Sequence, residues 1–211
     1  MATWQKTIYV TSILTMTIGN LFAIRQQNLK RFLAFSSISQ AGYILLGFIG
    51  GNQLGMASVI YYVLVYIFSN LGAFGVVTAI SNATGKENID DYNGLYHTNP
   101  GLSLVMTIAL FSLAGIPPVA GFFGKFFLFT AAAEKGYYLL VLIAVLNTII
   151  SLYYYLLVVK AMFINKSESP ISKFRSDFPT RFALAVCVAG IVVTGFASML
   201  FEAIRNISFG V

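Results

Sequence analysis

Residues 112–129 read SLAGIPPVAGFFGKFFLF. The stretch is apolar apart from a single lysine, Lys125, and two adjacent prolines, Pro117 and Pro118, interrupt it. From residue 92 to residue 133, Lys125 is the only lysine, arginine, aspartate or glutamate. Long apolar runs without charge are typical of membrane helices. The stretch therefore predicts an all-α membrane fold, in which the lysine and the prolines need an explanation.

The composition of the whole chain also indicates a membrane protein. Of its 211 residues, 58% are hydrophobic and 9% are charged, whereas soluble domains carry about 25% charged residues. The net charge of +6 gathers at helix ends, which favours membrane topology over binding to nucleic acid. The single cysteine, Cys187, excludes an internal disulfide, and no cluster of Cys and His predicts a metal site. No small-residue cleavage site follows residues 7–24, so we do not expect a signal peptide.

Six continuous apolar segments predict about six transmembrane helices, because a span needs ~20 apolar residues. A membrane β-barrel would instead alternate with a period of two in segments of ~10 residues. The polar segments 81–100 and 163–180 are predicted to be loops. The predicted helices cover roughly residues 6–24, 32–50, 54–80, 101–133, 136–162 and 181–202.

Basic residues are distributed unequally between the two sides of this predicted bundle. One side holds Lys6, Lys135 and Arg205. The other side holds Arg25, Lys30, Arg31, Lys86, Lys160, Lys166, Lys173, Arg175 and Arg181. The positive-inside rule places the richer side and both loops in the cytoplasm. Both termini are then expected outside, in a chain of the cell inner (plasma) membrane.

The charged residues of the first loop have a simple interpretation. Lys86 and Glu87 are predicted to be solvated, as are Asp90 and Asp91, and these two aspartates are suited to capping a short surface helix.

The fourth predicted helix is too long to be one straight span. About 33 residues would extend ~50 Å, against a hydrocarbon core of ~30 Å. Pro117 and Pro118 lack backbone donors and disfavour a helical residue before them, while Gly115, Gly121 and Gly124 permit unusual dihedral angles and close approach. We therefore expect the helix to unwind near mid-membrane, where open backbone must be buried in protein or line a wet cavity. Carrier proteins use such broken helices at their ion sites.

Three readings of Lys125 remain open. The next charged residue, Glu134, is nine positions further on, or ~13 Å along a helix. The side chain could snorkel to the interface. It could also pair with a carboxylate from elsewhere, since the apolar parts of the six helices contain no Asp or Glu. We favour a third reading, a proton relay, because burial favours the neutral form of a lysine and allows it to change protonation within reach of pH 7.

Polar residues at helical spacing extend this hypothesis to a path of ordered waters. On the third predicted helix, one face carries Tyr62, Tyr66, Ser69 and Asn70. On the second, one face carries Ser36, Ser39, Gln40 and Tyr43. For each residue alone, a role in holding helices together is the simpler interpretation. Lys30, beside Arg31 at a helix start, is more typical of an interfacial anchor than of a relay.

Four stretches together resemble one known family. They are TIGNLFAIRQQNLKRFLAFSSISQAGYILLG, VYIFSNLGAFGVV, SLAGIPPVAGFFGKFFLF and SLYYYLLVVKAMF. From about Ile18 to Phe163 the sequence resembles the antiporter-like membrane subunits of proton-pumping NADH:quinone oxidoreductase, respiratory complex I. The wider family includes subunits L, M and N and the Mrp-type sodium/proton antiporters. A lysine at position 125 favours N or L over M, in which a glutamate is usual, and the residues around the break together with SLYYYL favour N.

This resemblance implies a fold and a mechanism. The family fold has fourteen helices with two inverted five-helix repeats, each with a broken helix, and the six predicted helices match the last six. Lys125 then corresponds to the central lysine of the second broken helix. It would take a proton from a mid-membrane axis and release it outward, while electrons pass from NADH to quinone in other subunits. No cofactor is implied on this chain, because NADH, FMN, iron–sulfur clusters and quinone belong to the parent complex.

The resemblance also implies partners that are not in the sequence. The family's glutamate and two upstream lysines lie in a first repeat that these 211 residues lack. We therefore expect a C-terminal portion, which should not pump alone. Its partners would be the missing N-terminal half, neighbouring antiporter-like and small membrane subunits, and the lipid bilayer. The alternative is a subunit of an Mrp-type cation/proton antiporter with no redox partner, and a purely structural scaffold would leave Lys125 dispensable.

Overall fold

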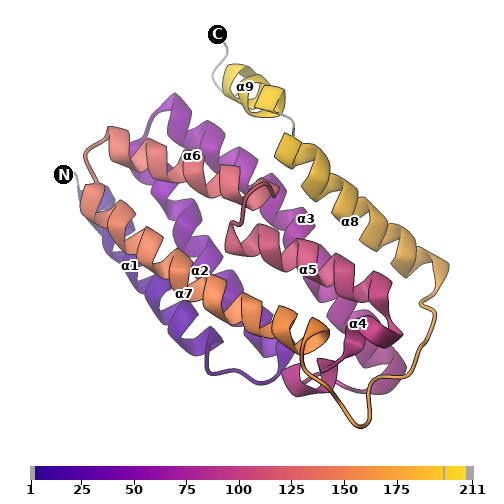
Figure 1. Ribbon diagram of the computed structural model, residues 1–211. Coiled ribbons are helices and arrows are strands. Elements are labelled where there is room, and N and C mark those ends of the chain that lie inside the picture. Colours follow the sequence, from indigo (N-terminus) through magenta and orange to yellow (C-terminus); the bar gives the residue numbers. More distant parts are fainter. Residues whose placement is uncertain (1–2, 197, 208–211) are drawn as a thin grey trace.

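The computed structural model describes residues 3–196 and 198–207, and these residues form an all-helical bundle (Figure 1). The long helices are α1 (Thr3–Ala23), α2 (Leu29–Gly50), α3 (Gln53–Thr84), α5 (Pro100–Ala114), α6 (Ala120–Glu134), α7 (Tyr138–Phe163) and α8 (Phe178–Phe196). The shorter elements are the 3-10 helix η1 (Ile89–Tyr92), α4 (Leu95–Thr98) and α9 (Ser198–Ile207). The predicted all-α fold class is therefore confirmed.

Four of the described helices are long and apolar enough to cross a membrane by length and composition: α2, α3, α7 and α8. They correspond to the second, third, fifth and sixth predicted spans. The fourth predicted span is divided between α5 and α6, and α5 is apolar but shorter than a full span. The first predicted span corresponds to α1, which is not among the four.

Helices α1 and α2 form a tightly packed antiparallel pair. A Cβ atom at Gly19 would lie 2.6 Å from the backbone nitrogen of Ser39, and one at Gly42 would lie 2.8 Å from that of Met16. Side chains larger than hydrogen would force the two backbones apart at both positions. Small residues serve in this way at the interfaces of membrane helices, where close van der Waals packing stabilises the pair.

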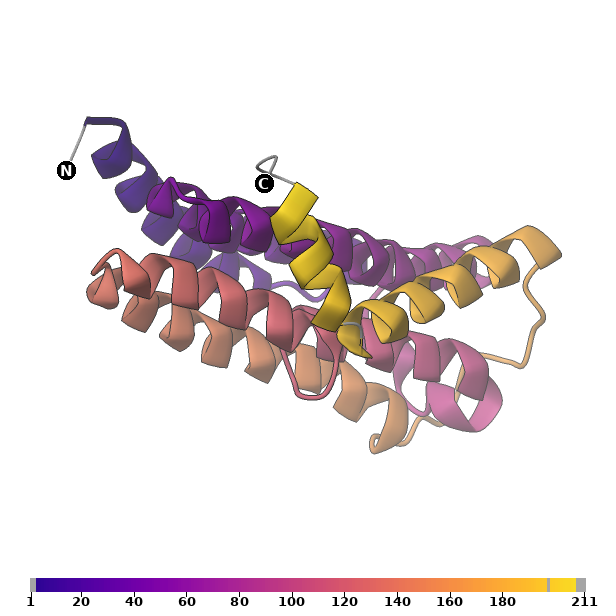
Figure 2. The same ribbon diagram turned by 90° about the horizontal axis from the view of Figure 1, so that it is seen from above.

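The predicted break lies where the prolines indicate. Helix α5 ends at Ala114, α6 begins at Ala120, and the peptide bond between Pro117 and Pro118 is cis. The connection projects from one face of the bundle (Figure 2), and both prolines are exposed on the described chain. Of the two expected alternatives, burial in protein and the lining of a wet cavity, burial within the described chain does not apply to the two prolines. Within the described connection, no backbone N–H group is left without a hydrogen bond. The two prolines have no N–H. The N–H of Ile116 donates to the Phe111 carbonyl and that of Val119 to the Ile116 carbonyl, both at 3.0 Å.

The C-terminal segment differs from the single predicted helix over 181–202. Helix α8 ends at Phe196 and α9 begins at Ser198, and Figure 2 shows α9 turned steeply away from the line of α8. The ring of Phe201 on α9 is buried, 3.8 Å from the ring centroid of Phe127, while Glu202 and Arg205 are exposed. The amphipathic pattern of α9 explains the turn, because a separate helix can pack its apolar side, with Phe201, against the bundle while its charged residues stay exposed.

Candidate functional site

Lys125 lies on the buried side of α6, less than two turns after the break. Its side chain is 3% exposed. The Nζ atom donates hydrogen bonds to the carbonyl oxygens of Leu113 at 2.9 Å and Ala114 at 3.3 Å. It also lies 4.6 Å from the centroid of the Tyr43 ring on α2, a distance typical of a cation–π interaction. The lysine therefore does not snorkel, and among the described residues no carboxylate forms an ion pair with it.

The acceptors of Lys125 are the last carbonyls of α5, which a helix leaves without intrahelical partners. Gly115, with φ of +81°, ends the helix in the left-handed conformation that favours glycine. Its N–H donates to the carbonyls of Phe111 and Ser112, both at 3.0 Å. The two carbonyls beyond these are the ones that bind Lys125. The negative end of the α5 dipole thus faces the ammonium group.

Two glycines of α6 allow close approach of its neighbours, Gly121 to the end of α5 and Gly124 to α3. A Cβ atom at Gly121 would lie 1.7 Å from the carbonyl oxygen of Ser112, and one at Gly124 would lie 2.7 Å from the ring of Tyr62. Gly115 permits the turn at the break and Gly121 permits contact between α5 and α6, whereas Gly124 permits contact with α3.

Gln40 on α2 connects the lysine to a buried polar network. Its Nε2 donates to the Leu113 carbonyl at 3.1 Å, so Gln40 and Lys125 share one acceptor. The same nitrogen donates to the Tyr155 hydroxyl at 3.2 Å. The Tyr62 hydroxyl donates to Gln40 Oε1. Tyr43 accepts a hydrogen bond from Thr148 Oγ1 on α7 at 3.2 Å. Helices α2, α3, α5, α6 and α7 therefore all contribute to the surroundings of Lys125.

The other predicted path residues on α3 lie along the same helix with different surroundings. Ser69 is buried, and its hydroxyl donates to Ser112 Oγ at 2.7 Å, next to the break. Tyr66 is half-buried and packs against the main apolar core. The Oδ1 atom of Asn70 is buried without a hydrogen-bond partner among the described residues. Thus Tyr62 and Ser69 reach the broken helix, while Tyr66 and Asn70 are not joined to Lys125 by a hydrogen bond that we find in the described chain.

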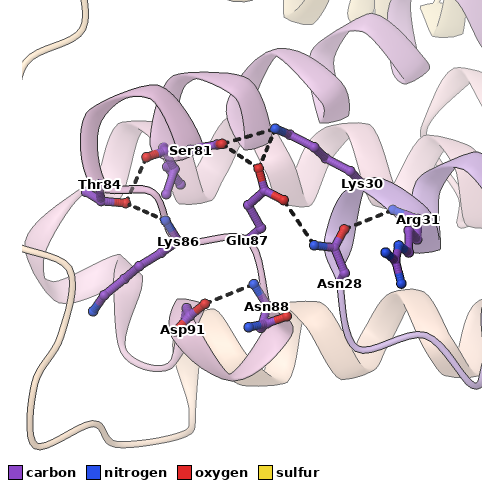
Figure 3. Close-up of polar contacts among 10 residues, drawn as sticks. Asn28, Lys30, Arg31, Ser81, Thr84, Lys86, Glu87, Asn88 and Asp91 are labelled. Carbon is purple, nitrogen blue, oxygen red and sulfur yellow. Dashed lines mark hydrogen bonds and ion pairs between the residues drawn. The ribbon is translucent and has the colours of Figure 1, made fainter.

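Lys30 belongs to a second polar cluster at the other end of α2 (Figure 3). Its Nζ pairs with Glu87 Oε1 and donates to Ser81 Oγ at 3.0 Å. It lies thirteen residues before Tyr43 on the same helix, or about 20 Å. The structure therefore does not bring Lys30 to the Lys125 network.

Glu87 corrects the expectation that this loop is merely solvated. Besides Lys30, its carboxylate accepts from Ser81 Oγ at 2.7 Å and from Asn28 Nδ2 at 3.0 Å. The ammonium of Lys30, followed by Ser81 and Asn28, lowers the pKa of Glu87 to about 2. Two backbone bonds of 2.8 Å, from Leu29 to Glu87 and from Ile89 to Gln27, support the cluster. As predicted, a neighbouring aspartate caps a short helix: Asp91 accepts from the N–H of Asn88 at 2.9 Å (Figure 3).

One further buried network was missed at the level of sequence. Asn20 on α1 donates to Asn147 on α7, at 3.0 Å to the carbonyl and 2.9 Å to Oδ1. The Tyr154 hydroxyl donates to Asn20 Oδ1 at 2.8 Å. The available signal was an isolated asparagine in each of two apolar segments, a pattern typical of interhelical hydrogen bonds. Among residues 3–196 and 198–207, no three His, Cys, Asp or Glu side chains gather as a metal site.

Comparison with known proteins identifies a family for this chain. A family model described as "NADH:quinone oxidoreductase/Mrp antiporter, TM" matches residues 1–151. The chain belongs to this family of membrane proteins. It is 59% identical over 204 residues to NADH-quinone oxidoreductase subunit N of Phocaeicola vulgatus, which covers 96% of this chain and 43% of that protein. The chain thus spans less than half the length of this relative.

Two solved structures share the fold. A chain of respiratory complex I from Thermus thermophilus is 31% identical, with a TM-score of 0.75, and the match covers 97% of this chain and 44% of that one. A chain of the Mrp complex from Dietzia sp. DQ12-45-1b has a TM-score of 0.87 at 22% identity, covering 97% of this chain and 47% of that one. The second likeness is one of fold alone.

Proposed function

We propose that the chain is part of a proton-translocating membrane subunit, subunit N, of an NADH:quinone oxidoreductase, and that Lys125 is its proton relay. The observation that carries this proposal is the burial of a lysine between an aromatic face and the open carbonyl end of a broken helix. A buried ionisable residue beside unwound backbone is the usual architecture of membrane proton and ion pathways. The relative in P. vulgatus, at 59% identity, supports subunit N.

The surroundings of Lys125 suit both of its protonation states. The ammonium form donates to the carbonyls of Leu113 and Ala114 and faces the ring of Tyr43. When the proton leaves, the neutral amine still has two N–H donors for these two carbonyls, and the Leu113 carbonyl also retains Gln40 as a donor. A change of charge at Lys125 is therefore passed to Gln40, and through it to Tyr62 and Tyr155. Redox chemistry would take place in other subunits, with NADH, FMN, iron–sulfur clusters and quinone.

The same proposal includes six membrane passes with both termini outside. Helices α5 and α6 have 15 residues each, or about 22 Å each, so neither spans a ~30 Å core alone. Taken together around the break they make one pass, with Lys125 near its middle. Helix α1 would make the remaining pass beside α2. The loops 81–100 and 163–180 then lie in the cytoplasm.

The alternative function, a subunit of an Mrp-type antiporter, uses the same site. Only the fold is shared with the Mrp chain at 22% identity, whereas the subunit N relative is 59% identical. The difference in identity favours the redox-coupled complex. The neighbouring genes would distinguish the two functions, since complex I genes would accompany a complex I subunit and Mrp genes would accompany an antiporter subunit.

The deciding experiment is Lys125→Ala in the full-length parent subunit, within the assembled complex in inverted membrane vesicles. Proton uptake driven by NADH and quinone reduction are recorded together. We expect proton uptake to be lost while the complex remains assembled, and quinone reduction to fall with it if the steps are coupled. Lys135→Ala is the matched control, because Lys135 is exposed at the end of the same helix. Unchanged uptake and electron transfer in Lys125→Ala would show that the lysine only caps α5.

A further inference from the structure

A cavity lies at the opposite end of α5 from the break. It has a volume of about 370 Å³ and is formed by the start of α5, the chain before α8 and the first turns of α8. Its floor is apolar, with Leu102 and Val105 from α5 and Leu184 from α8. Its rim carries the side chains of Lys173, Arg175 and Arg181. The cavity therefore joins three cations to a hydrocarbon surface.

The wall that carries the cations is fixed to the bundle. Asn99, which is 6% exposed, donates from Nδ2 to the Ser172 carbonyl at 3.2 Å. Its Oδ1 accepts from the N–H of Phe174, also at 3.2 Å. Ile171, just before these bonds, is buried in the main core. The Asn99 side chain thus fixes the backbone on both sides of Lys173, so the rim has a defined conformation.

The charge at this rim is not neutralised within the described chain. No carboxylate is among the residues that line the cavity. Neither Lys173 nor either arginine forms an ion pair with a described residue. The first turn of α5, with Pro100 and Gly101, lies at the same cavity and adds the positive end of its helix dipole. An anion with an apolar body would complement both parts of the cavity.

We propose that this cavity binds the headgroup of an anionic phospholipid. The phosphate would lie among Lys173, Arg175 and Arg181, and an acyl chain would follow Val105 and Leu184 along the groove between α5 and α8. Basic pockets at the ends of membrane helices recognise anionic lipid headgroups in this way, because the headgroups gather at the cytoplasmic surface. The apolar floor favours a lipid over free phosphate. The site rests on the proposed cytoplasmic position of the connection before α8, and it is independent of the role of Lys125.

The test compares Lys173→Gln/Arg181→Gln with the matched control Lys166→Gln in the intact, delipidated complex. Lys166 is exposed in the same connection but does not line the cavity. Dihexanoyl phosphatidylglycerol, dihexanoyl phosphatidylcholine and inorganic phosphate are titrated while the thermal midpoint is recorded. We expect phosphatidylglycerol to stabilise the parent and Lys166→Gln complexes equally. Its apparent affinity should fall about fivefold for each charge removed from the rim.

Three results would overturn the proposal. The first is an equal response of all variants to phosphatidylglycerol. The second is an equal response to phosphatidylcholine, which would mean that the groove is only apolar. The third is stabilisation by phosphate alone, which would mean a site for a free anion. If the double variant does not assemble, Lys173→Gln alone carries the test, with an expected fall in affinity of about fivefold.

Discussion

Gln40 donates to the Leu113 carbonyl and accepts from the Tyr62 hydroxyl, so these groups form one unit. Gln40→Leu would leave the hydroxyl of Tyr62, which is 3% exposed, without its acceptor. A buried polar group without a partner is costly. Tyr62→Phe removes that hydroxyl and hence the cost.

We therefore expect Gln40→Leu and Tyr62→Phe to be strongly non-additive. A double-mutant cycle on the thermal stability of the complex should give a coupling energy of roughly 0.5–3 kcal/mol. Additive effects would mean that the two side chains are not in contact. Tyr66→Phe paired with Gln40→Leu is the control cycle and should show additivity, because Tyr66 lies outside this set of hydrogen bonds.

The ion pair of Glu87 makes the stability of the folded chain depend on pH in the acidic range. Its carboxyl pKa lies at about 2, below the ordinary 4.5, since Lys30, Ser81 and Asn28 bind the ionised form. The stabilisation is fully present above pH 4.5 and is lost as the pH falls toward 2. We expect Glu87→Gln to lower the unfolding midpoint near pH 7, and the difference from the parent to shrink below pH 4.5. Asp90→Asn is the control, since Asp90 is exposed outside this cluster, and a difference for Glu87→Gln that does not shrink between pH 4.5 and pH 2 would contradict the ion pair.

The junction of α5 and α6 depends on the absence of a side chain at residue 121. Gly121→Ala would place a methyl group 1.7 Å from the Ser112 carbonyl oxygen, and the half-helices would have to separate. Overpacking of this kind costs roughly 1–3 kcal/mol, and it should also disturb Lys125. We expect a lower thermal midpoint and lower proton uptake. Gly101→Ala on α5 is the control, since a Cβ there meets nothing within 4 Å, and it should be neutral.

The helices themselves could be predicted from sequence because each signal was local. Continuous apolar runs predicted the long helices, and adjacent prolines with flanking glycines predicted the break between Ala114 and Ala120. The separate α9 could not be predicted by hydrophobicity alone, since the apolar run over 181–202 continues across the junction into the start of α9. The turn follows from a contact between Phe201 and Phe127, which are far apart in sequence.

The candidate site could be predicted only as far as its lysine. The burial of Lys125 followed from its apolar neighbours, but its partners are backbone carbonyls across the break, which carry no sequence signal of their own. The pairing of Lys30 with Glu87 joins residues 57 positions apart, so it depends on the tertiary fold. Asn20 and Asn147 were visible as isolated polar residues, yet which helix each one faces was not.

For the molecule as a whole, the distribution of basic residues predicts its orientation. Three lysines and arginines lie at one end of the predicted bundle and nine at the other. In a Cys187→Ser background, Ser169→Cys and Glu134→Cys place single thiols on opposite predicted sides. We expect a membrane-impermeant maleimide to label residue 134 from outside intact cells, and residue 169 only in inverted vesicles. Labelling of residue 169 in intact cells would reverse the proposed topology.

The use of backbone carbonyls at the end of α5 as the partners of Lys125 has a consequence for mutagenesis. The negative partner of Lys125 is a pair of peptide carbonyls, at Leu113 and Ala114, so no codon specifies it. A mutagenesis screen for an acidic residue that pairs with Lys125 will therefore find none on the described chain. The partner also carries no proton of its own, and it stays constant while the lysine titrates. Only a change that moves the end of the helix, such as a substitution at Gly115, can remove it.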